Sequence, residues 1–391
     1  MNNQYYIPYG KQKISEEDIS AVVKTLKSDF LTQGEQVPLF ENELSSFLGV
    51  PHCIAVNSGT SALHIACLSL ELNQDDYLWT SPISFVASAN CGRYCNAKID
   101  FVDINIKTGL IDINLLTQKL EKSELLGTLP KIIVVVHLAG SICEMKEMKK
   151  LSEKFGFKII EDASHSLGAE YENKKVGNCE YSDICVFSFH PVKIITTAEG
   201  GLATTSNNKL AERMKLLRTH FITKDQSKFT LKNFGKWSYE QQGLGFNYRM
   251  NDIQAALGLS QLNRISMIID ERNNILKTYK ELIYHKNISF LQIPDNVKSS
   301  VHLVVVLLNN ISLANYKKVF EEMRLRNIGV QLHYSPIHLQ PYYRKLGFKE
   351  GDYPNSEEYS KRALSLPVFE GLKYEDQKYV VNNLLEIIDF L

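Results

Sequence analysis

Two kinds of segment alternate between residues 40 and 205, and this alternation constrains the fold more than any other feature. Short apolar runs are followed by longer, helix-like stretches. Apolar strands that alternate with helices form a mostly parallel sheet with helices on both faces. We therefore expect an α/β fold. The apolar runs are 53–56, 77–80, 98–103, 132–136, 158–161 and 184–187.

The pattern changes after residue 223. The polar, aromatic stretch 223–247 predicts a long functional loop. Asn251 is a candidate N-cap for a helix over 252–265. A second long helix, over 264–282, is expected to link the two halves of the chain.

The chain has 391 residues, which is too long for one small core. After about residue 287 the pattern predicts an α+β unit, with a strand over 302–308 and a helix over 313–326. We therefore expect a large domain over 1–265, including the N-terminal segment, and a smaller α+β domain over 266–391.

Charge and composition argue against several classes of partner. The 44 basic residues balance 44 acidic residues, so no basic excess favours nucleic acid or a membrane surface. Residues 1–8 lack the features of a signal peptide, and the apolar run 303–308 is too short to span a bilayer. Seven scattered cysteines favour reduced thiols and a cytoplasmic location. Cys91 and Cys95 have no second pair beside them, so packed thiols are favoured over a zinc site.

The surroundings of Lys193 carry the strongest functional signal. It follows an apolar strand and precedes the turn 196–201, a setting that a solvated lysine does not need. Upstream, another apolar strand ends in Asp162, where open α/β sheets bind ligands. A pyridoxal phosphate (PLP) enzyme needs a lysine that holds an aldehyde as a Schiff base. It also needs a carboxylate that keeps a pyridine nitrogen protonated. Burial and a cationic ring would lower the pKa of Lys193 and make it a proton shuttle.

Segment 57–63 joins a strand to a helix and is a candidate phosphate site. Gly59 permits a tight turn, and the amides and hydroxyls of Thr60 and Ser61 would face outward at the helix N-terminus. An ordinary helix cap is the alternative interpretation. Ser188 could bind the same phosphate.

Other residues could contact the cofactor ring. Phe85 follows a strand-to-helix turn and could stack on the ring, although a core phenylalanine is the alternative. His165 could reach the ring hydroxyl. Asp162 itself could instead cap the next turn. The segment 199–201 predicts a turn into the next strand.

Several segments occur in an order that resembles a known family, the sugar aminotransferases of PLP fold type I. The resemblance covers about residues 5–345. It implies an aspartate-aminotransferase-like large domain with a smaller C-terminal domain, and a homodimer with sites at the subunit interface. Asn247 would then reach the phosphate of the partner subunit. Some relatives with His at the Schiff-base position are dehydratases, so Lys193 favours a transaminase. The segments are 32–34, 57–63, 161–163, 188–193, 199–201 and 245–250.

Three segments, 7–12, 188–193 and 333–343, are similar to one subgroup of that family. The subgroup makes UDP-4-amino-4,6-dideoxy-N-acetyl-β-L-altrosamine, an intermediate on the route to pseudaminic acid. The similarity implies that L-glutamate donates an amino group to the 4-keto group of a UDP-linked 4-keto-6-deoxy-N-acetylhexosamine. Ile194 departs from the pattern, where Pro is expected. The candidate substrate-binding residues are Tyr9, Lys11, Arg249, His333 and Tyr334.

A metal site is not expected. Pro336 lies between His333 and His338, which argues against a shared helical face, and no carboxylate sits at ligand spacing.

Four other functions are alternatives. The first is an aminotransferase for another 4-keto or 3-keto nucleotide sugar, and the second is a PLP-dependent sugar dehydratase. A Rossmann-type dehydrogenase would need a G-x-G-x-x-G motif after the early strand, and the sequence has none there. A non-catalytic PLP-binding or regulatory protein lacks support from a helix-turn-helix extension or a basic patch.

Overall fold

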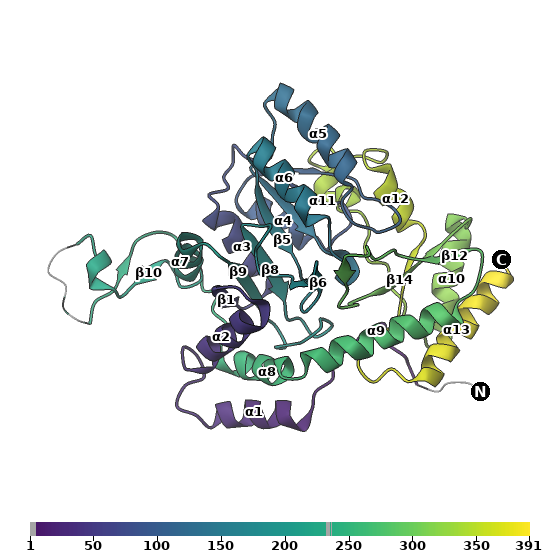
Figure 1. The fold of residues 1–391 in the computed structure, drawn as a ribbon, viewed down its shortest axis with the longest axis horizontal. Coiled ribbons are helices and arrows are strands. Elements are labelled where there is room, and N and C mark those ends of the chain that lie inside the picture. Colours follow the sequence, from purple (N-terminus) through teal and green to yellow (C-terminus); the bar gives the residue numbers. More distant parts are fainter. Residues whose placement is uncertain (1–4, 232–234, 236) are drawn as a thin grey trace.

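A computed structural model describes residues 5–231, 235 and 237–391 (Figure 1). Its centre is a seven-stranded sheet with the strand order β1-β9-β8-β5-β4-β2-β3. Neighbours from β3 to β8 are parallel, whereas β9 is antiparallel to both of its neighbours. The strands are β1 (His52–Val56), β2 (Tyr77–Thr80), β3 (Lys98–Phe101), β4 (Ile132–Val136), β5 (Lys158–Asp162), β8 (Ile184–Ser188) and β9 (Gly201–Thr205).

Helices cover both faces of this sheet, which explains why its central strands are apolar throughout. All five residues of β4 are buried. Ile132 and Val134 belong to one core cluster, whereas Ile133 and Val135 belong to another on the opposite face. The first cluster packs under α3 (Gly59–Ser69), α4 (Ala87–Tyr94) and α7 (Asn208–Leu217). The second packs under α2 (Gln36–Leu48), α5 (Ile113–Leu126), α6 (Met145–Phe155) and α8 (Asp252–Leu262). The predicted α/β fold class, a mostly parallel sheet flanked by helices, is confirmed.

A second, antiparallel sheet lies in the C-terminal part of the chain, with the order β12-β14-β15. The long helix α9 runs from α8 toward α13 beside the C-terminus (Figure 1). The elements are α9 (Ile265–Leu282), β12 (Ile288–Phe290), β14 (Val304–Leu308), α10 (Leu313–Leu325), α11 (Pro341–Arg344), α12 (Pro354–Ser360), β15 (Ala363–Leu366) and α13 (Tyr374–Asp389).

The two parts share contacts. Val305 of β14 belongs to the same core cluster as α6 and α8. A small sheet pairs β13 (Val297–Lys298) with β6 (Glu170–Tyr171), which also pairs with β7 (Lys174–Lys175). The division into domains 1–265 and 266–391 therefore stays a prediction, and residues 1–4 of the first lie outside the described residues. Further elements are α1 (Glu16–Leu26) and the 3-10 helices η1 (Leu138–Gly140), η2 (Gln226–Lys228) and η3 (Ile337–Leu339).

The predicted loop over 223–247 differs from expectation. Strands β10 (Ile222–Thr223) and β11 (Glu240–Gln241) pair antiparallel, and this hairpin projects from the body of the molecule (Figure 1). Residues 232–234 and 236 of the loop lie outside the described residues. Trp237 and Leu244 are 90 % and 80 % exposed.

The predicted N-cap Asn251 is confirmed, because its side chain accepts from the Gln254 amide in a capping box. Helix α8 ends at Leu262, and Arg264 precedes α9. Within the described ranges, no helix is long and apolar enough to cross a membrane.

Candidate active site

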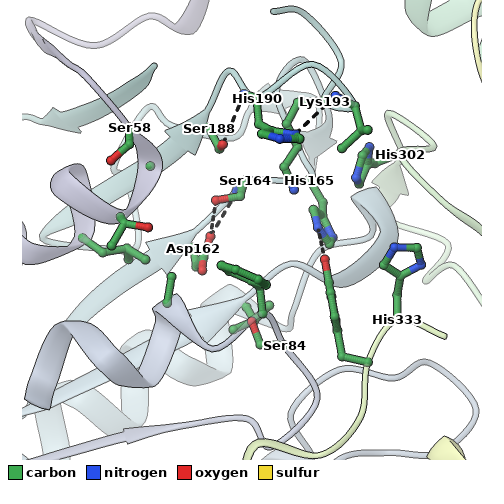
Figure 2. A pocket seen from close by; sticks show the side chains of 18 of the residues that line it. Ser58, Ser84, Asp162, Ser164, His165, Ser188, His190, Lys193, His302 and His333 are labelled. Atoms are coloured by element: carbon green, nitrogen blue, oxygen red, sulfur yellow. Dashed lines mark hydrogen bonds between the residues drawn. The ribbon is translucent and has the colours of Figure 1, made fainter. Parts of the chain in front are cut away.

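A cavity of about 420 Å³ lies at the carboxyl ends of the central parallel strands (Figure 2). Val136, Asp162 and Ser188, the last residues of β4, β5 and β8, line it. Ligands bind at this edge of open α/β sheets because strand-to-helix loops meet there. The predicted site residues that line the cavity are Tyr9, Gly59, Thr60, Phe85, Asp162, His165, Ser188, Lys193, His333 and Tyr334.

The N-terminus of α3 forms one wall. Gly59 and Thr60 begin the helix, so their amides have no carbonyl partner one turn earlier. A Cβ atom on Gly59 would lie 2.9 Å from the Cβ atom of Ser188, so glycine allows helix and strand to approach closely. On Gly201 it would lie 2.4 Å from the carbonyl carbon of Ser58. This close packing places the helix N-terminus, a favourable site for an anion, beside Ser188.

Ser61 lies differently from the prediction. Its hydroxyl donates to Asn57 Oδ1 at 2.6 Å, and its amide donates to the Ser58 Oγ atom at 3.0 Å. The expected outward-facing hydroxyl is therefore wrong: the side chain stabilises the turn, and Ser61 is absent from the cavity lining. The sequence suggested a cap, and Ser58 is that cap.

Asp162 is 6 % exposed and is held by three hydrogen-bond donors. Ser88 Oγ donates to Oδ2 at 2.6 Å. Ser164 donates to Oδ1 twice, from its backbone amide at 3.2 Å and from Oγ at 2.6 Å. Ser84 Oγ lies 2.6 Å from Ser88 Oγ and extends the chain of hydroxyls. These donors satisfy the oxygen atoms of a buried carboxyl group, which would otherwise lack partners.

Sequence reasoning missed both serine partners. Ser164 follows Asp162 by two residues, a spacing at which an Asp side chain commonly binds the chain that follows, so this contact had a local signal. Ser88 lies 74 residues before Asp162 and had none.

The neighbouring acid, Glu161, faces the other side of the sheet. His137 Nε2 lies 2.8 Å from its carboxylate, and Ser182 Oγ also donates to it. Successive residues of a strand point to opposite faces, so only Asp162 reaches the cavity.

Lys193 lies in the loop after β8, and its amide donates to the His190 carbonyl at 2.9 Å. The residue is half-buried, and its side chain borders the cavity. Burial lowers the Lys193 pKa to about 8, and the negative charge of Asp162 partly opposes this effect. A lysine with such a pKa supplies a neutral, nucleophilic amine near neutral pH.

His165 lies between Lys193 and the opposite wall (Figure 2). Its Nδ1 atom accepts from the Ala139 amide at 3.2 Å, and its Nε2 atom lies 3.1 Å from Tyr334 Oη. The centre of the His302 ring lies 4.3 Å from the centre of the His165 ring. Burial, with smaller effects from Lys193 and His333, holds the His165 pKa well below its usual value. His302 also lines the cavity, and no sequence signal indicated it.

The remaining wall comes from the C-terminal part of the chain and the N-terminal segment. His333 Nδ1 lies 2.8 Å from Ser365 Oγ, and its ring centre is 5.3 Å from that of Tyr9. Burial, together with Lys193, lowers the His333 pKa to about 3, so this ring is neutral at physiological pH.

Phe85 is 59 % exposed at the cavity edge, with its ring centre 6.4 Å from that of Tyr334. The alternative interpretation as a core phenylalanine is therefore wrong.

Three other predicted residues lie outside the cavity lining. Lys11 is exposed, and its Nζ atom lies 4.9 Å from the Phe369 ring centre. Asn247 is exposed and forms a β-bridge with Thr219. Arg249 forms a β-bridge with Val56 at the end of β1.

The described residues 5–231, 235 and 237–391 contain no group of three or more His, Cys, Asp or Glu side chains placed to hold a metal. The donor set fits a phosphorylated pyridine aldehyde instead. Lys193 would offer an amine to the aldehyde, Asp162 a carboxylate to the ring nitrogen, and α3 its N-terminus to the phosphate.

Comparison with known proteins agrees with this fit. Residues 12–385 match the profile of the DegT/DnrJ/EryC1/StrS aminotransferase family. The UDP-4-amino-4,6-dideoxy-N-acetyl-β-L-altrosamine transaminase of Campylobacter jejuni is 36 % identical over 384 residues, covering 98 % of each chain.

Two solved structures are similar along nearly their whole length. One is the Helicobacter pylori aminotransferase PseC, involved in the biosynthesis of pseudoaminic acid. It has 33 % identity and a TM-score of 0.89, covering 99 % of this chain and 100 % of that one. The other is a putative sugar aminotransferase from Streptococcus pneumoniae in its PLP form. It has 27 % identity and a TM-score of 0.89, covering 99 % of each chain. The chain belongs to the DegT/DnrJ/EryC1/StrS aminotransferase family and is a PLP-dependent sugar aminotransferase.

Proposed function

We propose that the protein moves an amino group from L-glutamate to the 4-keto group of a UDP-linked 4-keto-6-deoxy-N-acetylhexosamine. The products are UDP-4-amino-4,6-dideoxy-N-acetyl-β-L-altrosamine and 2-oxoglutarate. One observation carries the chemistry: a lysine of lowered pKa and a carboxylate with three donors border the same cavity. The choice of sugar is supported by similarity to the Campylobacter jejuni transaminase and to the Helicobacter pylori aminotransferase of pseudoaminic acid biosynthesis.

The side chains divide the work as follows. When bound, PLP supplies an aldehyde for the amine and a ring that withdraws electrons. Asp162 holds the positive charge of the ring nitrogen, and Ser88 and Ser164 hold Asp162. Lys193 Nζ accepts a proton from the α-carbon of glutamate and later gives one to the fourth carbon of the sugar. The first half-reaction releases 2-oxoglutarate, and the second consumes the keto sugar.

The substrates are proposed to enter from the wall that Tyr9, His333 and Tyr334 form. These residues line the cavity opposite the helix N-terminus of α3, and their rings offer both apolar faces and polar edges. Lys11 and Arg249 lie outside the lining of the cavity, and they stay candidates for contacts with the nucleotide or with the carboxylate of glutamate.

A homodimer with shared sites is part of the proposal. Asn247 is exposed and lies outside the cavity of its own chain, as a residue that serves a partner subunit would. The β10–β11 hairpin projects from the body of the molecule (Figure 1). The segment from 237 to 244 exposes large apolar side chains, among them Trp237 and Leu244. We also place the reaction in the cytoplasm, because the seven cysteines are free thiols.

The decisive experiment tests the two half-reactions separately. The purified protein, loaded with PLP, is mixed with L-glutamate, and 2-oxoglutarate is measured. The aminated enzyme is then offered UDP-linked 4-keto-6-deoxy sugars of both hexose series, and each product is identified by mass spectrometry and NMR. We expect the amino sugar of the L-altro configuration. Release of 2-oxoglutarate with amination of a different sugar would refute the proposed substrate and leave the reaction class intact.

A further inference from the structure

We infer that the Ala139 backbone holds His165 in a single neutral tautomer, and that this makes Tyr334 a hydrogen-bond donor toward an oxygen of the sugar. The inference rests on the proposed function for the identity of the ligand. It makes His165 and Ala139 positioning residues, which act through Tyr334.

The first step is the donor at Ala139. A backbone amide can only donate, so the 3.2 Å contact makes His165 Nδ1 an acceptor. The Ala139 carbonyl accepts from the amides of His302 and Leu303, at 3.0 and 3.3 Å. Both polar groups of Ala139 are therefore engaged, and η1 is tied to the segment that leads into β14. The position of this donor is set by the fold.

The second step is the proton on the ring. A neutral imidazole whose Nδ1 atom accepts a hydrogen bond carries its proton on Nε2. Nε2 lies 3.1 Å from Tyr334 Oη, so His165 donates to the tyrosine (Figure 2). The titratable groups that face His165 are Lys193, His302, His333 and Tyr334. Burial and the neighbouring amine disfavour a second proton on the ring.

The third step is the hydroxyl of Tyr334. Burial raises the pKa of this phenol, and Asp162 and Tyr9 raise it further, so the O–H group keeps its proton. Because Oη already accepts from His165, its own proton points away from that ring. Tyr334 lines the cavity, so an oxygen atom of a ligand is the partner that it can serve. A cofactor oxygen that accepted the His165 proton would compete with Oη for it, and Tyr334 would still keep its own.

The tautomer can be tested without turnover. Cofactor-free protein with ¹⁵N-labelled histidine is studied by long-range ¹H–¹⁵N correlation at pH 6 and pH 7. The H165Q variant, which lacks one ring, assigns the signals. We expect a protonated Nε2 and an unprotonated Nδ1 for His165 at both pH values. A proton on Nδ1, or a doubly protonated ring, overturns the inference.

The consequence for the substrate is tested by a double-mutant cycle. Y334F should lower kcat/KM for the keto sugar about tenfold, the effect of one buried hydrogen bond, and change PLP affinity less than about twofold. H165Q preserves the direction of the hydrogen bonds that run from Ala139 through residue 165 to Tyr334, because the glutamine carbonyl accepts from Ala139 and the glutamine amide donates to Tyr334. In H165Q, Y334F should again cost about tenfold. Leucine can neither accept from Ala139 nor donate to Tyr334, so in H165L the Y334F substitution should lower kcat/KM only about threefold or less.

The outcomes are distinguishable. Equal costs of Y334F in all three backgrounds overturn the inference, as does a loss of PLP affinity with the sugar step unchanged. Thermal unfolding identifies any variant that fails to fold. If H165L does not fold, a cost of Y334F that differs between wild type and H165Q overturns the inference, and the tautomer spectrum tests it separately. A wild-type enzyme that aminates no sugar refutes the proposed function, whereas the spectrum decides the tautomer independently.

Discussion

Replacement of Ser88 by alanine tests whether the hydroxyls around Asp162 support the chemistry. Ser88 is fully buried, and its Oγ atom donates to Asp162 Oδ2 at 2.6 Å. A hydrogen bond to a charged group contributes about 1.5–3 kcal/mol. S88A removes this bond, while Ser164 keeps two donors on Oδ1. Because the remaining donors compensate in part, we take the lower end of that range, which corresponds to about a tenfold loss in kcat/KM.

The assay needs controls for the loss of a buried hydroxyl. S69A is matched: Ser69 is also buried, but it lies at the far end of α3 and donates to the Ala66 carbonyl at 2.9 Å. S84A removes the outer hydroxyl of the chain, which contacts Ser88 at 2.6 Å, so its effect should be smaller than that of S88A. The rates of both half-reactions are measured at saturating PLP, together with PLP affinity and thermal unfolding. If S88A is as active as S69A, the hydroxyl does not support Asp162 and the reasoning is refuted.

Four other substitutions or conditions probe the same geometry. D162N keeps the shape of the side chain but loses its charge, so the glutamate half-reaction should slow about a hundredfold while the folded state persists by circular dichroism; full activity would show another partner for the ring nitrogen. E161A should reduce stability more than rate, because Glu161 contacts His137 and Ser182 on the face of the sheet away from the cavity. The free energy of unfolding in a urea titration should fall by about 3 kcal/mol, and the rate should change less than in D162N. The Lys193 amine has a pKa of about 8 and must be neutral to attack an aldehyde. The rate at which PLP attaches to the cofactor-free protein, measured by stopped-flow absorbance, should therefore rise with pH below about 8 and level off above it. A flat profile between pH 6 and 9 contradicts the lowered pKa, and K193A should show no attachment. In G201A the new Cβ atom would lie 2.4 Å from the Ser58 carbonyl carbon, so the approach of β9 to α3 must widen; we expect a loss of about 1–3 kcal/mol in stability and weaker PLP binding. In G347A no atom lies within 4 Å of the new Cβ atom, but φ is +107°, so we expect backbone strain to lower stability while PLP binding stays unchanged.

Local chemistry in the sequence was sufficient for much of the fold. The run 132–136 consists only of isoleucine and valine, and a short run of β-branched residues favours a strand covered on both faces. Asn251 carries its own capping signal, because a cap bonds within its first turn. Lys193 was identified through its sequence neighbours, and Asp162 through its place at a strand end. Each of these inferences depends on residues a few positions apart.

Contacts between distant segments were decided only by the tertiary structure. Ser88 meets Asp162 because α4 packs against β4, the neighbour of β5 in the sheet, and Ala139 meets His165 because η1 lies beside the loop after β5. His302 and Tyr334 come from loops in the C-terminal part of the chain and complete the same wall. The pairing of β10 with β11 likewise involves two residues on each side, too few for a local pattern. A sequence shows which groups a chain carries and which face of a strand they take, whereas the partner that each group meets depends on how the elements pack. The chemistry was therefore predictable from single segments, whereas the hydrogen bonds between distant segments that orient it were not.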